Sequence, residues 1–136
     1  MTEQADNARP AIAAAIIVEG GRVLLVRRRV SEGQLSWQFP AGEVEPDETG
    51  EQAAVRETME EVGLTVTAAK MLGERVHPNT GRTMLYVACD VVSGTATVAD
   101  EDELDAVEWC DRAKLVEHIP YPLFEPVQEH ITASVS

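Results

Sequence analysis

Long hydrophobic runs are absent from this chain of 136 residues. The longest strongly apolar stretch covers residues 11–18, whereas a membrane-spanning helix needs about 20 apolar residues. The stretch also lacks the basic upstream flank of a signal peptide, because Glu3 and Asp6 precede it together with Arg9. We therefore expect a cytoplasmic protein without membrane contact, in which residues 1–10 form a flexible tail.

Basic residues are scarce, with 11 Lys and Arg against 24 Asp and Glu, which gives a formal net charge of −13. The average surface therefore repels the phosphate backbone of DNA or RNA, and a nucleic-acid polymer is not an expected partner. Solubility accounts for much of the acidic excess. A small anion remains compatible with this charge where arginine or a metal ion lies locally.

Cysteine is nearly absent, and Cys89 and Cys110 both lie in apolar, strand-like runs. Two isolated cysteines form neither a disulfide framework nor a metal-ligand cluster, and buried free thiols are typical of a reducing compartment. Internal repeats, low-complexity segments and linkers are also absent. The length then fits one domain over residues 11–136, present as a monomer or a homodimer.

Short apolar segments separated by turn residues predict strands mixed with two or three helices, and therefore an α/β or α+β fold in layers. A hairpin is expected around Gly20-Gly21, and residues 29–37 are expected to form a loop. The other expected strands cover residues 64–76 with a break near 68–71, then 83–91 and 107–110. Short helices are expected after Asp111 and around Phe124, Val127 and Ile131.

The clearest predicted helix covers residues 50–62. Thr49 and Gln52 match a capping box at its start, and Gly63 is a natural stop. On a helical wheel, one side carries residues suited to pack on a sheet, namely Val55, Thr58, Met59 and Val62. The opposite side carries Glu57, Glu60 and Glu61, with the small Ala53 one turn earlier.

Three carboxylates on one helical face are unfavourable by themselves. They repel one another at the i,i+3 and i,i+4 spacings, and the helix dipole disfavours negative charge in the last turns. A divalent cation removes both penalties, and oxygen ligands suit Mg²⁺ or Mn²⁺ better than zinc. A solvated acidic face would give the same wheel, so the wheel alone leaves both interpretations open.

A longer motif favours the metal. Gly42 is followed after five residues by Glu48, and after seven more by Arg56-Glu57-Thr58-Met59-Glu60-Glu61-Val62-Gly63-Leu64. This pattern resembles the Nudix box along its whole length, apart from Thr58, where the family usually has an aliphatic residue. Trp37-Gln38-Phe39-Pro40-Ala41-Gly42 resembles the family's entry to the box, with Ala41 in place of a usual glycine. The resemblance covers residues 11 to about 131.

The resemblance implies a Nudix α/β/α sandwich, with a mixed β-sheet and the box as loop–helix–loop. It also implies hydrolysis of a nucleoside diphosphate linked to another group, with Mg²⁺ or Mn²⁺. Glu57 and Glu61 match the family's main metal ligands, with Glu60 beside them and the carbonyl of Gly42 as a further ligand. Arg56 and Glu48 match a pair that braces the loop against the helix.

The general base and the substrate contacts are less defined. The base is a box glutamate or a distant one, for which Glu101 and Glu103 are the candidates. Arg28 matches a phosphate-contacting position of the family. His77 and Arg82 lie on a predicted turn and are candidates to line the substrate pocket.

The short chain resembles the MutT-like branch, which hydrolyses nucleoside triphosphates. Phe124, however, stands before Glu125-Pro126, where MutT has an asparagine that reads the purine edge. Phe124 either stacks on a base or packs in the core. We expect a (d)NTP pyrophosphatase that releases the nucleoside monophosphate and pyrophosphate, with modest base preference. The alternatives are an ADP-ribose or nucleotide-sugar pyrophosphatase, for which Pro78 is an approximate marker, and a non-catalytic Nudix ligand-binding module.

Overall fold

The computed structural model describes residues 9–29 and 35–136. Of the flexible tail expected over residues 1–10, all but Arg9 and Pro10 lies outside the described residues. In the described part of the chain, no helix is both long and apolar enough to cross a membrane.

The described residues form strands with three helices. The elements in chain order are β1 (Ile12–Glu19), β2 (Arg22–Arg29), β3 (Leu35–Gln38), β4 (Ala41–Glu43), α1 (Gly50–Val62), β5 (Thr65–Val76), β6 (Thr83–Ser93), β7 (Leu104–Cys110), α2 (Arg112–His118) and α3 (Glu125–Ser134).

The strands form a mixed sheet in the order β3-β2-β1-β6-β5, with β4 paired to β1 and β7 paired to β2. Among the described strands, β1 and β6 pair in parallel, and the other pairs are antiparallel. The expected hairpin joins β1 to β2, and Gly20 and Gly21 both have positive φ, as a tight two-residue hairpin turn requires.

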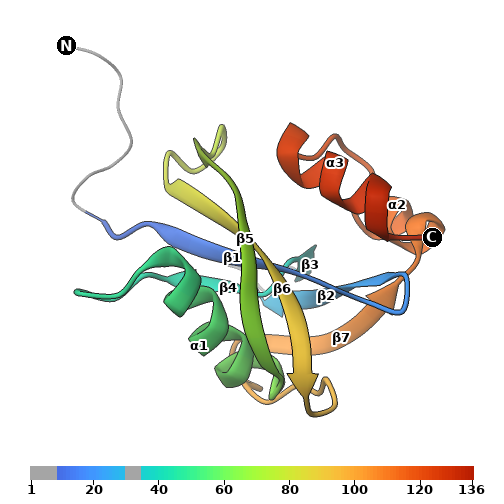
Figure 1. Ribbon diagram of the computed structural model, residues 1–136, viewed down its shortest axis with the longest axis horizontal. Coiled ribbons are helices and arrows are strands. Elements are labelled where there is room, and N and C mark those ends of the chain that lie inside the picture. Colours follow the sequence, from blue (N-terminus) through green and yellow to red (C-terminus); the bar gives the residue numbers. More distant parts are fainter. Residues whose placement is uncertain (1–8, 30–34) are drawn as a thin grey trace.

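Helices cover both faces of the sheet (Figure 1), so the expected α/β class is confirmed. One core lies under α1 and contains Ala13, Ala15, Val62 and Leu64. The other lies under α2 and α3 and contains Ala14, Ile16, Leu115 and Ile131. Because neighbouring residues of β1 point to opposite faces, this one apolar strand contributes to both cores.

Helix α1 begins and ends as its sequence predicts. The side chain of Thr49 accepts a hydrogen bond from the backbone of Gln52 at 3.0 Å, and the Gln52 side chain accepts one from the backbone of Thr49 at 2.9 Å. Gly63 ends the helix in the left-handed conformation, with φ 75°. These caps satisfy backbone groups that a helix end leaves without a partner.

The buried face of α1 differs from the wheel. Met59, expected to pack on the sheet, is 46% exposed, whereas Glu61, expected on the acidic side, is only 3% exposed. The small Ala53 and Ala54 are fully buried and let the helix approach the sheet closely, which turns Glu61 inward. Thr58 is buried as expected, and its hydroxyl donates to the carbonyl of Ala54.

Three strand boundaries also differ from expectation. The loop expected over residues 29–37 is shorter, because β2 ends at Arg29 and β3 begins at Leu35, while residues 30–34 lie outside the described residues. The break expected near residues 68–71 consists of register shifts within one continuous strand, β5. Strand β7 begins at Leu104, because it pairs with β2 along Arg27 and Arg28.

Candidate active site

The carboxylate of Glu57 lies directly against the backbone of β4. A Cβ atom added at Gly42 would lie 2.1 Å from Cδ of Glu57, a distance that no real side chain permits. A side chain at Gly42 would displace the end of the Glu57 side chain, so glycine lets the carboxylate lie against β4. Burial raises the pKa of Glu57, although Arg56 opposes the shift.

Glu61 is nearly buried and is held by an arginine from another element. Nη2 of Arg28 in β2 donates to both carboxylate oxygens of Glu61, at 3.0 and 2.9 Å. The backbone N–H of Ala41 also donates to Glu61. Burial still dominates and raises the pKa of Glu61 to about 7. A positive charge added beside this group would stabilise its ionised form.

Arg56 connects the loop before α1 to the acidic face of the helix. Its Nε and Nη2 atoms donate to the two oxygens of Glu48, at 2.8 and 3.0 Å. The Nη1 atom donates to Glu57 at 3.0 Å and to Glu60 at 3.1 Å. The hydrogen bond from Arg56 lowers the pKa of Glu48 to about 2. These contacts join Arg56 of the helix to Glu48 of the loop before it, and the bracing role that the resemblance implies for the pair stays a prediction.

The remaining glutamates differ in their distance from this cluster. The side chain of Glu60 is 56% exposed and reaches the cluster through Arg56. Glu103 is 57% exposed, and Nη1 of Arg28 contacts it at 3.3 Å. Within residues 9–29 and 35–136, Glu101 meets an arginine through its backbone carbonyl alone, which accepts from Arg29. Arg28 therefore links Glu103 to Glu61, while the side chain of Glu101 has no such link in the described residues.

A cavity of about 520 Å³ opens beside the cluster, on the sheet face that carries α3. Ala41 and Gln38 line it, and both also contact Arg28: the carbonyl of Ala41 and Oε1 of Gln38 accept from its guanidinium. None of the described lining residues is Asp or Glu. Arg75, His77 and Arg82 line it, so the cavity differs sharply from the acidic average of the chain.

Three of the four candidate substrate residues line this cavity, namely His77, Arg82 and Phe124. Arg82 donates to Glu43 and to the carbonyl of Pro10, while its buried Nε has no hydrogen-bond partner among the described residues. The fourth candidate, Arg28, instead lies in the carboxylate cluster.

Sequence reasoning missed Arg75, which lies on the cavity wall. Arg75 lies in β5, which ends at Val76, and it stands two residues before the candidate pocket residue His77; this closeness along the chain was its signal.

The carboxylate cluster fits a hard divalent cation. Glu61 is buried and Glu57 is partly buried, burial raises the pKa of both carboxylates, and Gly42 brings its backbone against Glu57. All the donors are oxygens, which Mg²⁺ and Mn²⁺ prefer.

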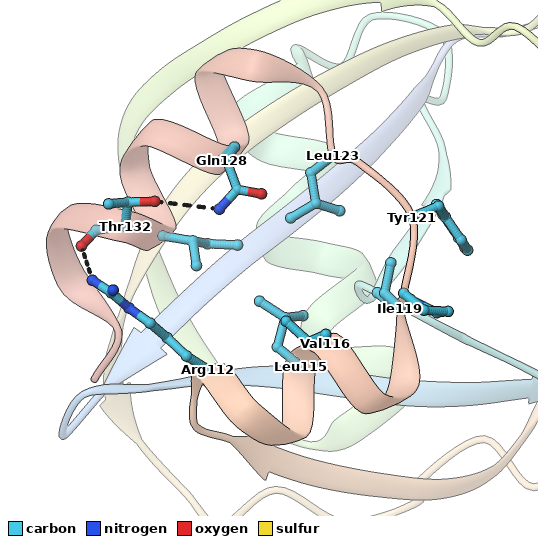
Figure 2. A pocket seen from close by; sticks show the side chains of 10 residues that line it. Arg112, Leu115, Val116, Ile119, Tyr121, Leu123, Gln128 and Thr132 are labelled. Carbon is cyan, nitrogen blue, oxygen red and sulfur yellow. Dashed lines mark hydrogen bonds between the residues drawn. The ribbon is translucent and has the colours of Figure 1, made fainter.

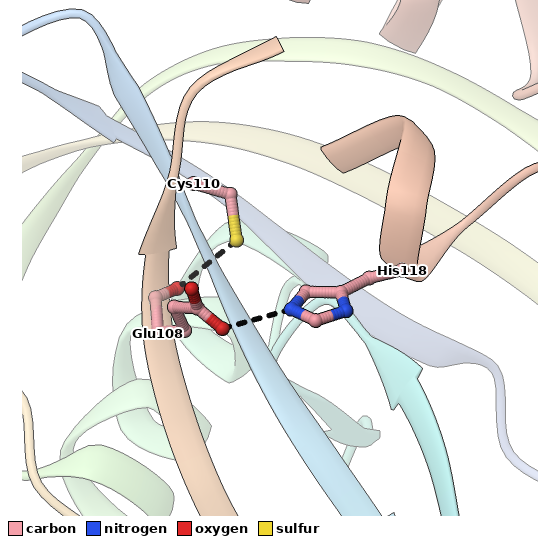
Figure 3. Close-up of side chains that lie close together, drawn as sticks. All are labelled: Glu108, Cys110 and His118. Atoms are coloured by element: carbon pink, nitrogen blue, oxygen red, sulfur yellow. Dashed lines mark hydrogen bonds and ion pairs between the residues drawn. The ribbon is translucent and has the colours of Figure 1, made fainter. Parts of the chain in front are cut away.

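Two other features are separate from this cluster. A smaller hollow of about 210 Å³ lies between α2 and α3 and is lined by Arg112, Leu115 and Ile131 among others (Figure 2). Elsewhere, Glu108, Cys110 and His118 offer ligand atoms within 4.8 Å of one another (Figure 3). His118 is already 2.8 Å from Glu108 and stacks on Trp37, and burial raises the pKa of the Cys110 thiol to about 12. This trio links α2 to β7 and supports the wall at Trp37.

Comparison with known proteins agrees with the architecture. The sequence pattern of the NUDIX domain matches residues 7–134. The chain is 32% identical over 123 residues to a CTP pyrophosphohydrolase of Escherichia coli, covering 90% of each protein. The E. coli ORF135 protein has a similar solution structure, with TM-score 0.64 and 31% identity over 94% of this chain and 90% of that one. A NUDIX hydrolase from Nitrosomonas europaea gives TM-score 0.75 at 20% identity, over 93% and 91% of the two chains.

The chain therefore belongs to the NUDIX domain family. It is a Nudix hydrolase, an enzyme of the pyrophosphohydrolase class.

Proposed function

We propose that this protein hydrolyses nucleoside triphosphates or their deoxy forms to the nucleoside monophosphate and pyrophosphate. The observation that carries this proposal is the cavity without acidic side chains in a chain of net charge −13. Its arginines and aromatic rings suit an anionic nucleotide, and it meets the carboxylate cluster at Ala41 and Gln38. A relative named as a CTP pyrophosphohydrolase supports including cytidine triphosphates among the first substrates to assay.

We further propose Mg²⁺ or Mn²⁺ as the cofactor, held by Glu57, Glu61 and the carbonyl of Gly42, with Glu60 beside them. Such an ion neutralises pyrophosphate charge and lowers the pKa of a bound water. Arg56 holds Glu57 and Glu60 in place from the Glu48 brace. Phosphoryl chemistry depends mainly on such positioning and charge neutralisation.

Between the two distant candidates for the general base, the contacts favour Glu103. Arg28 holds its carboxylate beside Glu61, and its exposure leaves an oxygen free to accept a proton from the attacking water. Arg28 thereby positions Glu61 and Glu103, and the phosphate contact expected of it stays a prediction. Two free, buried thiols support the expected cytosolic location, where the protein would act as a monomer or a homodimer.

A substrate panel with Mg²⁺ tests the proposal. The panel contains NTPs, dNTPs, oxidised dNTPs, ADP-ribose and nucleotide sugars, and released phosphate and pyrophosphate are measured separately. We expect pyrophosphate from triphosphates, and loss of this product in the Glu57→Gln variant. A strong preference for ADP-ribose or a nucleotide sugar over every triphosphate would overturn the substrate assignment and leave the family unchanged.

A further inference from the structure

One arginine of the cavity lies on an aromatic platform. The guanidinium carbon of Arg75 is 5.0 Å from the centre of the Phe124 ring and 5.8 Å from that of Tyr86. Its Nε donates to the Tyr86 hydroxyl at 3.3 Å. Stacking on aromatic rings orients the plane of a guanidinium and leaves its remaining N–H groups for recognition.

The platform is itself built by close packing. The rings of Tyr86 and Phe124 are 5.3 Å apart. Gly73 in β5 makes room for Phe124, since a Cβ atom there would lie 2.9 Å from the ring. Phe124 therefore packs against the sheet and lines the cavity at the same time, and its stacking on a base stays a prediction.

The Nη atoms of Arg75 are available to a ligand. Within residues 9–29 and 35–136, no carboxylate lies within ion-pair distance of Arg75, although the chain has 24 acidic residues. Arg27, Arg28, Arg56 and Arg82 all pair with carboxylates. Arg75 thus differs from these arginines in facing a cavity with its charge and outer donors unpaired.

The strand register places Arg75 at the distance that a nucleotide spans. A row of paired residues crosses the sheet from β4 to β5. It runs from Ala41 in β4 through Ala14 in β1 and Tyr86 in β6 to Gly73 in β5. Arg75 follows Gly73 by two residues. Three strand spacings separate the two ends of this row, about 14 Å. A ligand with its phosphates beside Ala41 would therefore extend its base toward the platform.

We propose that Arg75 is a specificity-determining residue that selects nucleobases presenting two adjacent hydrogen-bond acceptors, as cytosine does with O2 and N3 and guanine with O6 and N7. The inference rests on the proposed function, because it concerns the base of that nucleotide. The planar fork of arginine matches such an acceptor pair. Adenine and uracil present no such pair, because the amino group of adenine lies beside N1 and N7 and the N3–H of uracil lies beside both of its carbonyls, so one N–H of the guanidinium has no acceptor.

The test compares kcat/KM for CTP, GTP, ATP and UTP in the wild type and in Arg75→Gln, Arg75→Lys and the control Arg22→Gln, which alters an exposed arginine at the start of β2. We expect Arg75→Gln to lower the values for CTP and GTP by about 10- to 100-fold and to change those for ATP and UTP by less than about threefold. Arg75→Lys, which keeps the charge without the fork, should show the same loss of preference. Arg22→Gln should match the wild type.

Binding of CMP, GMP, AMP and UMP, measured by calorimetry in the same variants, separates this inference from the proposed function. If the wild type hydrolyses no triphosphate, but CMP and GMP bind through Arg75, the proposed function fails and the base selection stands. An equal loss for all four bases would assign Arg75 to the phosphates and overturn the inference. An unchanged profile in Arg75→Gln would also overturn it.

Discussion

The carboxylate cluster and the cavity beside it use arginine in opposite ways. In the cluster, Arg28 and Arg56 are held by Glu61, Glu48 and Glu57 and fix the positions of those carboxylates. In the cavity, Arg75 rests on aromatic rings without an acidic partner in the described residues. The net charge of −13 therefore hides a division between an anionic region suited to cations and a cationic cavity suited to an anion.

The largest expected effect comes from neutralising the cluster. Glu57→Gln or Glu61→Gln should lower kcat by about 1,000-fold, because each removes several kcal/mol of charge stabilisation from the metal site, while the fold survives. Turnover and circular dichroism are measured together. Glu60→Gln is the matched control, and its loss should be smaller because Glu60 is 56% exposed. Near wild-type turnover in both main variants would remove the metal-site hypothesis.

The next effect distinguishes the two glutamates that are candidates for the general base, Glu103 and Glu101. Glu103→Gln should lower kcat by about 100-fold, the ordinary contribution of general-base catalysis, with little change in KM. Glu101→Gln should remain close to the wild type, because its side chain is not linked to Arg28. Steady-state kinetics of the two variants show which glutamate acts as the general base. Equal losses, or a larger one in Glu101→Gln, would contradict the assignment.

On the cavity side, Phe124→Ala should raise KM for all four bases together, because stacking is largely independent of sequence. The same change should lower the free energy of unfolding, by less than the about 3–5 kcal/mol of a fully buried phenylalanine, since Phe124 is only half-buried. One thermal melt and one kinetic series measure the two effects. A loss of stability with unaltered KM would make Phe124 a packing residue only.

The smallest effect is a pH dependence of stability. Burial raises the pKa of Glu61 to about 7 from an ordinary 4.5. The metal-free native state therefore binds more protons than the unfolded state in this window, so its stability should fall as pH rises from about 4.5 through about 7. At acidic pH, Mg²⁺ must displace the proton of Glu61 before it can bind. The rise in Tm that Mg²⁺ causes should therefore be larger at pH 8 than at pH 5.5. Melts of the wild type and Glu61→Gln provide the check: an equal pH response in the variant would place its origin elsewhere.

Local features of the molecule could be predicted from the sequence, because their causes are close in the chain. Thr49, Gln52 and Gly63 fixed the ends of α1, and the Gly20-Gly21 pair fixed the first hairpin. The motif from Gly42 to Leu64 identified the family and the enzyme class, and both are confirmed. The roles of the individual site residues stay predictions.

Features that depend on distant contacts could not be predicted. The burial of Glu61 depends on Arg28, 33 positions away, and on the close approach that Ala53 and Ala54 allow. Arg75 faces the rings of Tyr86 and Phe124 because β5, β6 and the start of α3 lie together there. No local sequence pattern predicts that these three segments come into contact. The wheel of α1 placed Glu57, Glu60 and Glu61 on one side of the helix but could not show that Glu61 turns toward the sheet.

The division between the two regions is tested most directly by measuring Mn²⁺ binding and CMP binding in the same three proteins. The account predicts that the Glu57→Gln/Glu61→Gln double variant loses tight Mn²⁺ binding, followed by electron paramagnetic resonance, while it still binds metal-free CMP. It predicts that Arg75→Gln binds Mn²⁺ like the wild type and loses CMP. If either variant lost both ligands, or if the double variant bound Mn²⁺ as tightly as the wild type, the division would be contradicted.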